Sequence, residues 1–289
     1  MIVDRVMARA AAQALDRKPQ RMSASSVGRC VRQCWYMEHG YPAEPLNARA
    51  LLLFELGDRV EDSVLHYVAQ TDLEHLRTGG PGDTFTVPEV GFRGRPDLIF
   101  QCPIQDWSPD TELGIMAIAP TDLLPPEAGE IVGGEVKSMA DFGFARAQRG
   151  EIDEGYRAQC ECYMRALNIR WWLLVAYRKE TSHLCEVWIG RDDNRWQQIK
   201  DAVRVARGDE MPVRPYVLDE RCHGAKDGTC VDGKTPGRGQ PHKRCGGSGM
   251  EPGGPFIPNF PCGYCAWKAP CWGDIEIVFR DGKPAWRVK

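Results

Sequence analysis

Two short acidic motifs, each joined to an apolar stretch, constrain the fold of this chain more than any other feature. Residues 94–100 read Gly-Arg-Pro-Asp-Leu-Ile-Phe, and residues 133–137 read Gly-Gly-Glu-Val-Lys. Short apolar runs bounded by glycine or proline are typical of buried strands, so we expect Asp97 and Glu135 on strands of an α/β fold. Side chains alternate between faces along a strand, and Glu135 and Lys137 therefore point the same way.

Two carboxylates beside an ammonium group are the groups that a hard divalent cation and a scissile phosphate require. Oxygen ligands hold Mg²⁺, and Lys137 can face the phosphate or the attacking water. Each motif also has an ordinary interpretation. Glu-x-Lys is common on solvated strand faces, and Pro-Asp is common in turns.

Two helical patterns add further polar residues. Gln159 and Tyr163 are four residues apart in a helical stretch over 151–168, so they share one face. Upstream, the amphipathic pattern of residues 48–70 carries Glu61. In chain order the motifs are Gly-x-x-x-Glu, Pro-Asp, Glu-x-Lys and Gln-x-x-x-Tyr.

This ordered set resembles the PD-(D/E)XK nuclease superfamily, specifically its RecB-like exonuclease branch. The resemblance implies a restriction-endonuclease-like core, in which a mixed central sheet is flanked by helices. It also implies Mg²⁺- or Mn²⁺-dependent hydrolysis of DNA, most simply as an exonuclease. Many members carry His at the position of Glu61.

The resemblance also implies roles for individual residues. Asp97 and Glu135 would ligate the metal with the carbonyl of Val136, and Glu61 would be a further ligand. Lys137 would orient or activate the attacking water. Gln159 and Tyr163 would position Lys137 or the DNA backbone.

Twelve cysteines in a chain without an apolar signal core favour metal binding over disulfides. Cys262, Cys265 and Cys271 form a C-x2-C-x5-C run, whose three thiolates call for a fourth ligand. The candidates are Cys30 and Cys34. The ligand types suit zinc and iron–sulfur clusters alike.

Cys30 is followed by Arg32 and the aromatic pair Trp35-Tyr36. This pattern, together with the C-terminal cysteine run, resembles the iron–sulfur nucleases of the same branch. They include AddB-type helicase-nucleases and CRISPR-associated exonucleases. That resemblance implies a [4Fe–4S] cluster, bound by Cys30 and the three C-terminal cysteines, that joins the two ends of the chain. Val31 stands where the family usually has proline.

Residues 211–261 are rich in Gly, Pro and Cys and have little apolar periodicity. One interpretation is a zinc site, with the candidate ligands Cys222, His223, Cys230, His242 and Cys245. The alternative is a flexible basic loop with incidental cysteines. Residues 221–250 contain six basic and two acidic side chains, so we expect this segment to bind DNA and Lys243 and Arg244 to contact DNA phosphates.

These patterns divide the chain into four expected segments. They are an N-terminal extension over 1–22, a nuclease core over 23–210, the basic insert over 211–261 and a cysteine-bearing segment over 262–289. Within them we expect helices over 23–40, 48–70, 151–168 and 192–207, and strands over 84–87, 89–100, 171–177 and 184–189. Residues 102–130 are expected to form a surface excursion, and residues 275–288 a hairpin.

Composition leaves the partner open. Lys and Arg number 37 against 40 Asp and Glu, so the net charge of −3 does not itself indicate nucleic-acid binding. No run of some 18 apolar residues predicts a membrane span, and we expect a cytoplasmic protein, bacterial or phage-encoded. The alternatives are a DNA-binding subunit that depends on a helicase, recombinase or integrase, and a structural Fe–S protein with an inert core.

Overall fold

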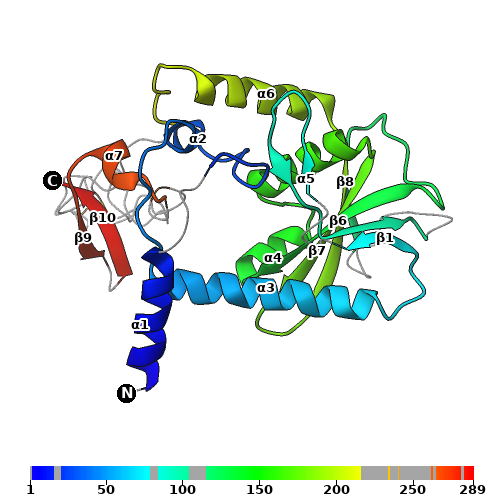
Figure 1. The fold of residues 1–289 in the computed structure, drawn as a ribbon, viewed down its shortest axis with the longest axis horizontal. Helices are drawn as coiled ribbons and strands as arrows, with labels where there is room; N and C mark the ends of the chain where they lie inside the picture. The colour runs from blue at the N-terminus through cyan, green and yellow to red at the C-terminus, as the bar shows by residue number, and fades with distance from the viewer. Residues whose placement is uncertain are drawn as a thin grey trace. The chain divides into compact units, whose positions relative to one another are not determined.

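The protein is described here from a computed structural model that covers residues 2–15, 21–78, 84–103, 115–215, 234, 240, 262, 265–280 and 283–289 (Figure 1). The chain divides into two units. The first comprises Met1–Tyr41 and Pro45–Pro212, and the second comprises Pro42–Glu44 and Val213–Lys289. Each unit is described by itself.

The first unit is built on a mixed six-stranded sheet, as the sequence predicts. Its strands lie in the order β1 (His75–Thr78), β4 (Leu98–Gln101), β6 (Ile131–Met139), β7 (Trp171–Arg178), β8 (Leu184–Gly190) and β5 (Ile115–Ile118). The central strands β6 and β7 are parallel, and each pairs antiparallel with its outer neighbour, β4 or β8. Edge strand β1 is antiparallel to β4, and edge strand β5 is parallel to β8.

Six helices belong to this unit: α1 (Ile2–Leu15), α2 (Val31–Glu38), α3 (Ala48–Val68), α4 (Asp141–Ala147), α5 (Glu154–Leu167) and α6 (Asp193–Arg207). Helices α3, α4 and α5 pack against the central strands. Side-chain caps set where three helices begin. Asn47 caps α3, Asp153 caps α5 and Asp192 caps α6, each by accepting a hydrogen bond from a backbone N–H of the first turn.

Large apolar side chains fill the space around the sheet. Trp171 and Trp188 are 2% exposed and Trp172 is fully buried, which confirms the predicted buried strand at 171–177. Packing explains the glycine at position 133, two residues before Glu135. A Cβ atom at Gly133 would lie 2.0 Å from the Trp172 ring, so no other residue fits without moving that ring.

Three predicted segments differ in the structure. The helix expected over 23–40 is α2 alone, because Ser23 and Ser26 bond to each other in a turn before it. The strand expected over 89–100 is two strands. Strand β3 (Arg93–Gly94) pairs with β2 (Phe85–Thr86), whereas β4 joins the main sheet. Pro96 lies between them and has no N–H for a ladder.

The third difference lies in the excursion predicted over 102–130. It contains β5, whose backbone continues the central sheet beyond β8. The run Ile115-Met116-Ala117-Ile118 is only four residues long and is surrounded by polar and proline-rich sequence. A parallel partner about 70 residues away, rather than local periodicity, makes it a strand.

The second unit contains α7 (Lys268–Trp272) and an antiparallel hairpin of β9 (Ile275–Arg280) and β10 (Lys283–Val288). The hairpin confirms the prediction for 275–288. Cys262 and Trp272 are buried against its strands, and Lys268 forms an ion pair with Glu44. Among the described residues, no helix has both the length and the apolar character that a bilayer crossing needs.

Candidate active site

Strand pairing brings the two acidic motifs together. Antiparallel register places Leu98 opposite Gly134, so Asp97 and Glu135 lie side by side at the junction of β4 and β6. The backbone N–H of Val136 donates to Asp97 Oδ2 at 2.8 Å, which fixes the Asp97 carboxylate against β6. Both carboxylates are buried, with 5% exposure at Asp97 and 4% at Glu135.

The two oxygens of Glu135 have different surroundings. Oε1 accepts hydrogen bonds from Lys137 Nζ and from Gln159 Nε2, the latter at 2.7 Å. Oε2 is buried and has no hydrogen-bond partner in the described part of the chain. A buried carboxylate oxygen without a donor is costly unless a cation or water binds it.

Helix α5 supplies Gln159 and Tyr163 to the same spot, on one helical face as predicted. Gln159 Nε2 also donates to Tyr163 Oη at 3.0 Å. The Tyr163 ring packs edge-on against Phe85, with 5.4 Å between ring centroids. A Cβ atom at Gly94 would lie 2.4 Å from Tyr163 Cε1, so glycine lets strand β3 approach the ring. The sequence pattern alone did not reveal this role of Gly94.

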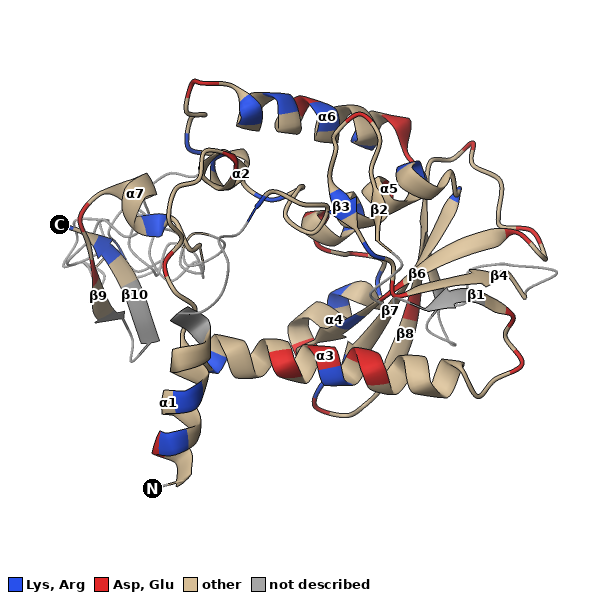
Figure 2. Ribbon diagram, in the orientation of Figure 1, with Lys and Arg blue, Asp and Glu red and all other residues tan. Residues whose placement is uncertain are grey.

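A pocket of about 360 Å³ opens over these groups. Glu61 reaches it from α3, so five of the predicted site residues share one pocket; its lining comprises Ser25, Glu61, Thr84, Arg93, Gly94, Arg95, Asp97, Glu135, Gln159 and Tyr163. Figure 2 shows acidic residues on α3 and basic residues at β3, and each of these elements contributes a charged residue to the lining, Glu61 and Arg93 respectively.

Burial is the largest cause of the raised pKa values of the clustered acids. Burial, followed by the charge of Asp97, raises the pKa of Glu61 to about 7. Burial raises the pKa of Glu135 to about 8, although Lys137 opposes the shift, and burial also raises the pKa of Asp97. Burial lowers the pKa of Lys137, but the charges of Glu135 and Asp97 outweigh it and raise that pKa. Lys137 is therefore protonated at neutral pH.

The donor set fits a divalent cation. Among the described residues, no three His, Cys, Asp or Glu side chains are already arranged as a metal site. Mg²⁺ needs no such cage, because one or two carboxylates with waters commonly hold it. The unbonded Oε2 of Glu135 and the neighbouring Asp97 carboxylate are oxygen ligands of the kind that such a cation takes.

The candidate cluster cysteines fall in both units. Cys34 is 4% exposed, its thiol donates to the Ser26 carbonyl at 3.5 Å, and burial raises its pKa to about 12. Cys30 is half-buried, directly before α2. In the second unit the Cys265 N–H donates to the Cys262 carbonyl at 3.0 Å, which closes a turn across the C-x2-C pair.

The remaining cysteine predictions divide into two groups. Four cysteines are buried within the first unit, as predicted for small apolar side chains; they are Cys102, Cys160, Cys162 and Cys185. The predicted zinc and DNA-contact residues of the insert lie outside the described residues; they are Cys222, His223, Cys230, His242, Lys243, Arg244 and Cys245.

Comparisons with known proteins give distant structural likenesses. No protein-family model matches the chain, and no curated protein matches it. The crystal structure of LHK-Exo in complex with dAMP is 16% identical, with a TM-score of 0.39 over 70% of this chain and 90% of that one. A crystal structure of the alkaline exonuclease LHK-Exo from Laribacter hongkongensis is 14% identical over the same shares, with a TM-score of 0.40.

The crystal structure of SSO0001 is 13% identical over 71% of this chain and 85% of that one, with a TM-score of 0.38. Because all three TM-scores are below 0.5, the functional assignment depends on the residues of the site itself.

Proposed function

We propose that this chain is a Mg²⁺- or Mn²⁺-dependent deoxyribonuclease of the PD-(D/E)XK type. The observation that carries the proposal is the state of Glu135. One of its oxygens is engaged by Lys137 and Gln159, and the other is buried without a donor beside Asp97. A purely structural carboxylate would have both oxygens satisfied.

The proposed roles follow from the geometry. Asp97 and Glu135 hold the cation, with Glu61 and the carbonyl of Val136 as further ligands. A bound divalent cation would polarise the phosphate and make a water nucleophilic at neutral pH. Lys137, which donates to Glu135 Oε1, orients or activates the attacking water and stabilises the negative charge that develops on the phosphate.

Gln159 and Tyr163 act on the catalytic groups from α5. Gln159 Nε2 donates to the same Oε1 of Glu135 as Lys137 does, and it also donates to Tyr163 Oη, which fixes the Gln159 amide. The two donors to Oε1 restrict the rotation of the Glu135 carboxylate and so aim Oε2 at the cation. Pre-aligned groups of this kind lower the reorganisation needed at the transition state.

We further propose that the enzyme is an exonuclease of the RecB-like branch. A direct test compares a linear duplex with a covalently closed circle of the same sequence, each with Mg²⁺, with Mn²⁺ and with EDTA. An exonuclease degrades only the linear DNA and only with metal. Cleavage of the closed circle would identify an endonuclease, and inactivity on both would favour a DNA-binding subunit that needs a helicase or integrase partner.

The resemblance also supports a [4Fe–4S] cluster bound by Cys30, Cys262, Cys265 and Cys271. The buried, hydrogen-bonded Cys34 thiol favours Cys30 as the ligand from the N-terminal side. A visible absorption spectrum of anaerobically purified protein, with iron and zinc measured on the same sample, tests this. Brown protein with about four iron atoms per chain is expected, whereas colourless protein with stoichiometric zinc would identify a Cys₄ zinc site.

A further inference from the structure

We propose that the β2–β3 hairpin carries a second phosphate-binding site, formed by Arg93 and Arg95 with the hydroxyls of Ser25 and Thr84. Its ligand is a non-scissile phosphate of the DNA strand, adjacent to the phosphate that is cleaved. The inference rests on the proposed nuclease function, because the site shares the pocket of the metal-binding carboxylates.

The first evidence is the state of the two arginines. Arg93 and Arg95 are exposed and line the pocket. In the part of the chain that the structure describes, neither guanidinium has a hydrogen-bond or ion-pair partner. Other arginines of this unit are paired, such as Arg178 with Asp141 at 2.6 Å. Guanidinium groups bind phosphate in a bidentate manner, so two unpaired ones that line the same pocket suit that ligand.

The second evidence is their position relative to the carboxylates. Arg95 is two residues from Asp97 in the chain, and Arg93 and Arg95 line the same pocket as the carboxylates of Glu61, Asp97 and Glu135. The arginines therefore share the pocket of the acidic groups, and no ion pair joins them to these groups among the described residues. A strand that places one phosphate at the carboxylates would bring its neighbour to the arginines. Ser25 and Thr84 can add hydroxyl donors of the kind that often contact DNA phosphates.

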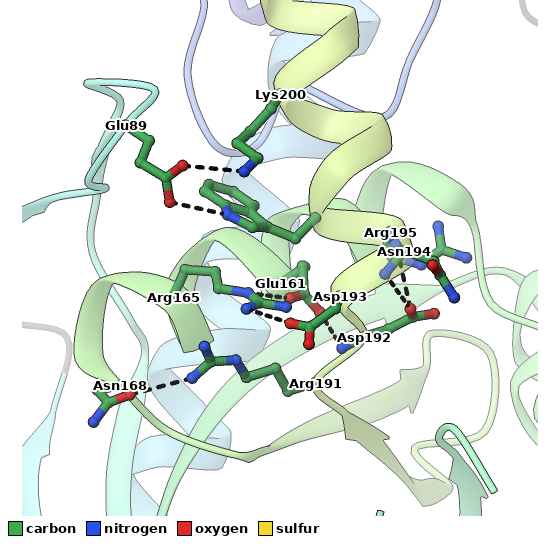
Figure 3. A network of polar contacts seen from close by, with 11 residues as sticks. Glu89, Glu161, Arg165, Asn168, Arg191, Asp192, Asp193, Asn194, Arg195 and Lys200 are labelled. Atoms are coloured by element: carbon green, nitrogen blue, oxygen red, sulfur yellow. Dashed lines mark hydrogen bonds and ion pairs between the residues drawn. The ribbon is translucent and has the colours of Figure 1, made fainter. Parts of the chain in front are cut away.

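The third evidence is that the hairpin is held rigidly on α6. Glu89 lies in the loop between β2 and β3 with a left-handed φ of 64°. Its carboxylate accepts from Trp196 Nε1 at 3.2 Å and from Lys200 Nζ at 3.1 Å (Figure 3). Arg207 Nη2 donates to the Val90 carbonyl at 2.7 Å. Such contacts hold the arginine-bearing strand in place before any DNA binds.

Helix α6 is joined in turn to the catalytic helix α5. Glu161 is 1% exposed and accepts from Arg165 Nε at 2.6 Å and from the Asp192 N–H at 3.0 Å. Arg165 also pairs with Asp193 at 2.7 Å (Figure 3). Since α5 carries Gln159, one polar network fixes the arginine hairpin and the Glu135 carboxylate relative to each other. A two-phosphate site requires that fixed spacing.

The test removes one charge from the protein and one from the DNA. Arg93→Gln and Arg95→Gln are compared with Arg204→Gln, which removes an exposed arginine of α6 that pairs with Asp201 on its own helix. Binding of a fluorescent single strand is measured in EDTA, so that no cleavage occurs. A series of strands each carries one neutral methylphosphonate at a different position.

We expect each pocket variant to weaken binding by about tenfold and to flatten the slope of log K against log salt by about 0.7, with the control nearly unchanged. One methylphosphonate position should weaken the wild type by a similar factor and leave Arg93→Gln or Arg95→Gln unaffected. Additive losses at every position, or variants that bind like the wild type, would overturn the proposal. Circular dichroism of each variant confirms folding.

The same proteins separate this inference from the proposed function. If the wild type fails to cleave DNA with any metal, the nuclease proposal fails, and the binding series still decides whether the arginines hold one particular phosphate. If the wild type cleaves DNA but the arginine variants bind like Arg204→Gln, only the second phosphate site is wrong.

Discussion

Replacing Glu135 with glutamine is expected to stabilise the metal-free protein while abolishing its activity. Glutamine keeps the shape and can still accept from Lys137 and Gln159, but it removes the buried charge. Because the pKa of Glu135 is about 8 in the folded protein and 4.5 in the unfolded chain, the difference destabilises the metal-free wild type at pH 8 by roughly 4 kcal/mol. This cost already includes the attraction of Lys137. The weaker hydrogen bonds of a neutral amide offset part of it, so we expect a net gain of about 1–3 kcal/mol.

The gain should depend on pH with a definite sign. The folded protein binds a proton at Glu135 up to about pH 8, whereas the unfolded chain releases it near 4.5. Stability of the metal-free wild type should therefore fall as the pH rises between these values, and Glu135→Gln should lack that contribution. The advantage of the variant should be small near pH 5 and largest near pH 8.

The assay is urea unfolding in EDTA at several pH values, repeated with Mg²⁺. Mg²⁺ should stabilise the wild type by binding its folded state and should stabilise Glu135→Gln much less. Glu151→Gln is the matched control, because Glu151 is exposed and its pKa is lowered by Arg149 rather than raised. A variant less stable than the wild type in EDTA at pH 8, or an advantage independent of pH, would refute the reasoning.

Three further predictions concern other parts of the chain. Gly94→Ala should reduce cleavage and lower the free energy of unfolding by about 1–3 kcal/mol, because the new Cβ would lie 2.4 Å from the Tyr163 ring. Cleavage assays and urea unfolding test this, and wild-type values in both would contradict it. Cys30→Ser should lose the visible absorption of the cluster and Cys34→Ser should keep it, whereas the reverse pattern would move the ligand by one helical turn. Neutralising the basic pair Lys243-Arg244 should flatten the salt dependence of DNA binding by about one to two units, and an unchanged slope would place the insert away from DNA.

The motifs of the candidate site were predictable because their signals are local. Alternation along one strand puts Glu135 and Lys137 on one face, and helical spacing puts Gln159 and Tyr163 on another. The apolar run 171–177 was long enough to identify a buried strand. These elements follow from periodicity within a few residues, and the structure has all of them.

Features that depend on long-range pairing were not predictable in the same way. Strand β5 is a strand because β8 pairs with it, and its own four residues carry little signal. Glu161 and Arg165 have the i,i+4 spacing that is common for ion pairs on exposed helix faces, yet both are largely buried and contact Asp192 and Asp193 at the start of α6. The sequence signal for the burial of Glu161 is its position among the residues on the buried face of α5.

The central claim is that Asp97, Glu135 and Lys137 form a metal-dependent phosphodiesterase site. The most direct measurement is the initial rate of cleavage of end-labelled linear DNA by the wild type, Asp97→Ala, Glu135→Ala and Lys137→Ala, in Mg²⁺, Mn²⁺ and EDTA. The account predicts cleavage by the wild type only with metal, and losses of several orders of magnitude in all three folded variants. Cleavage by Glu135→Ala at the wild-type rate, or wild-type cleavage that persists in EDTA, would contradict it.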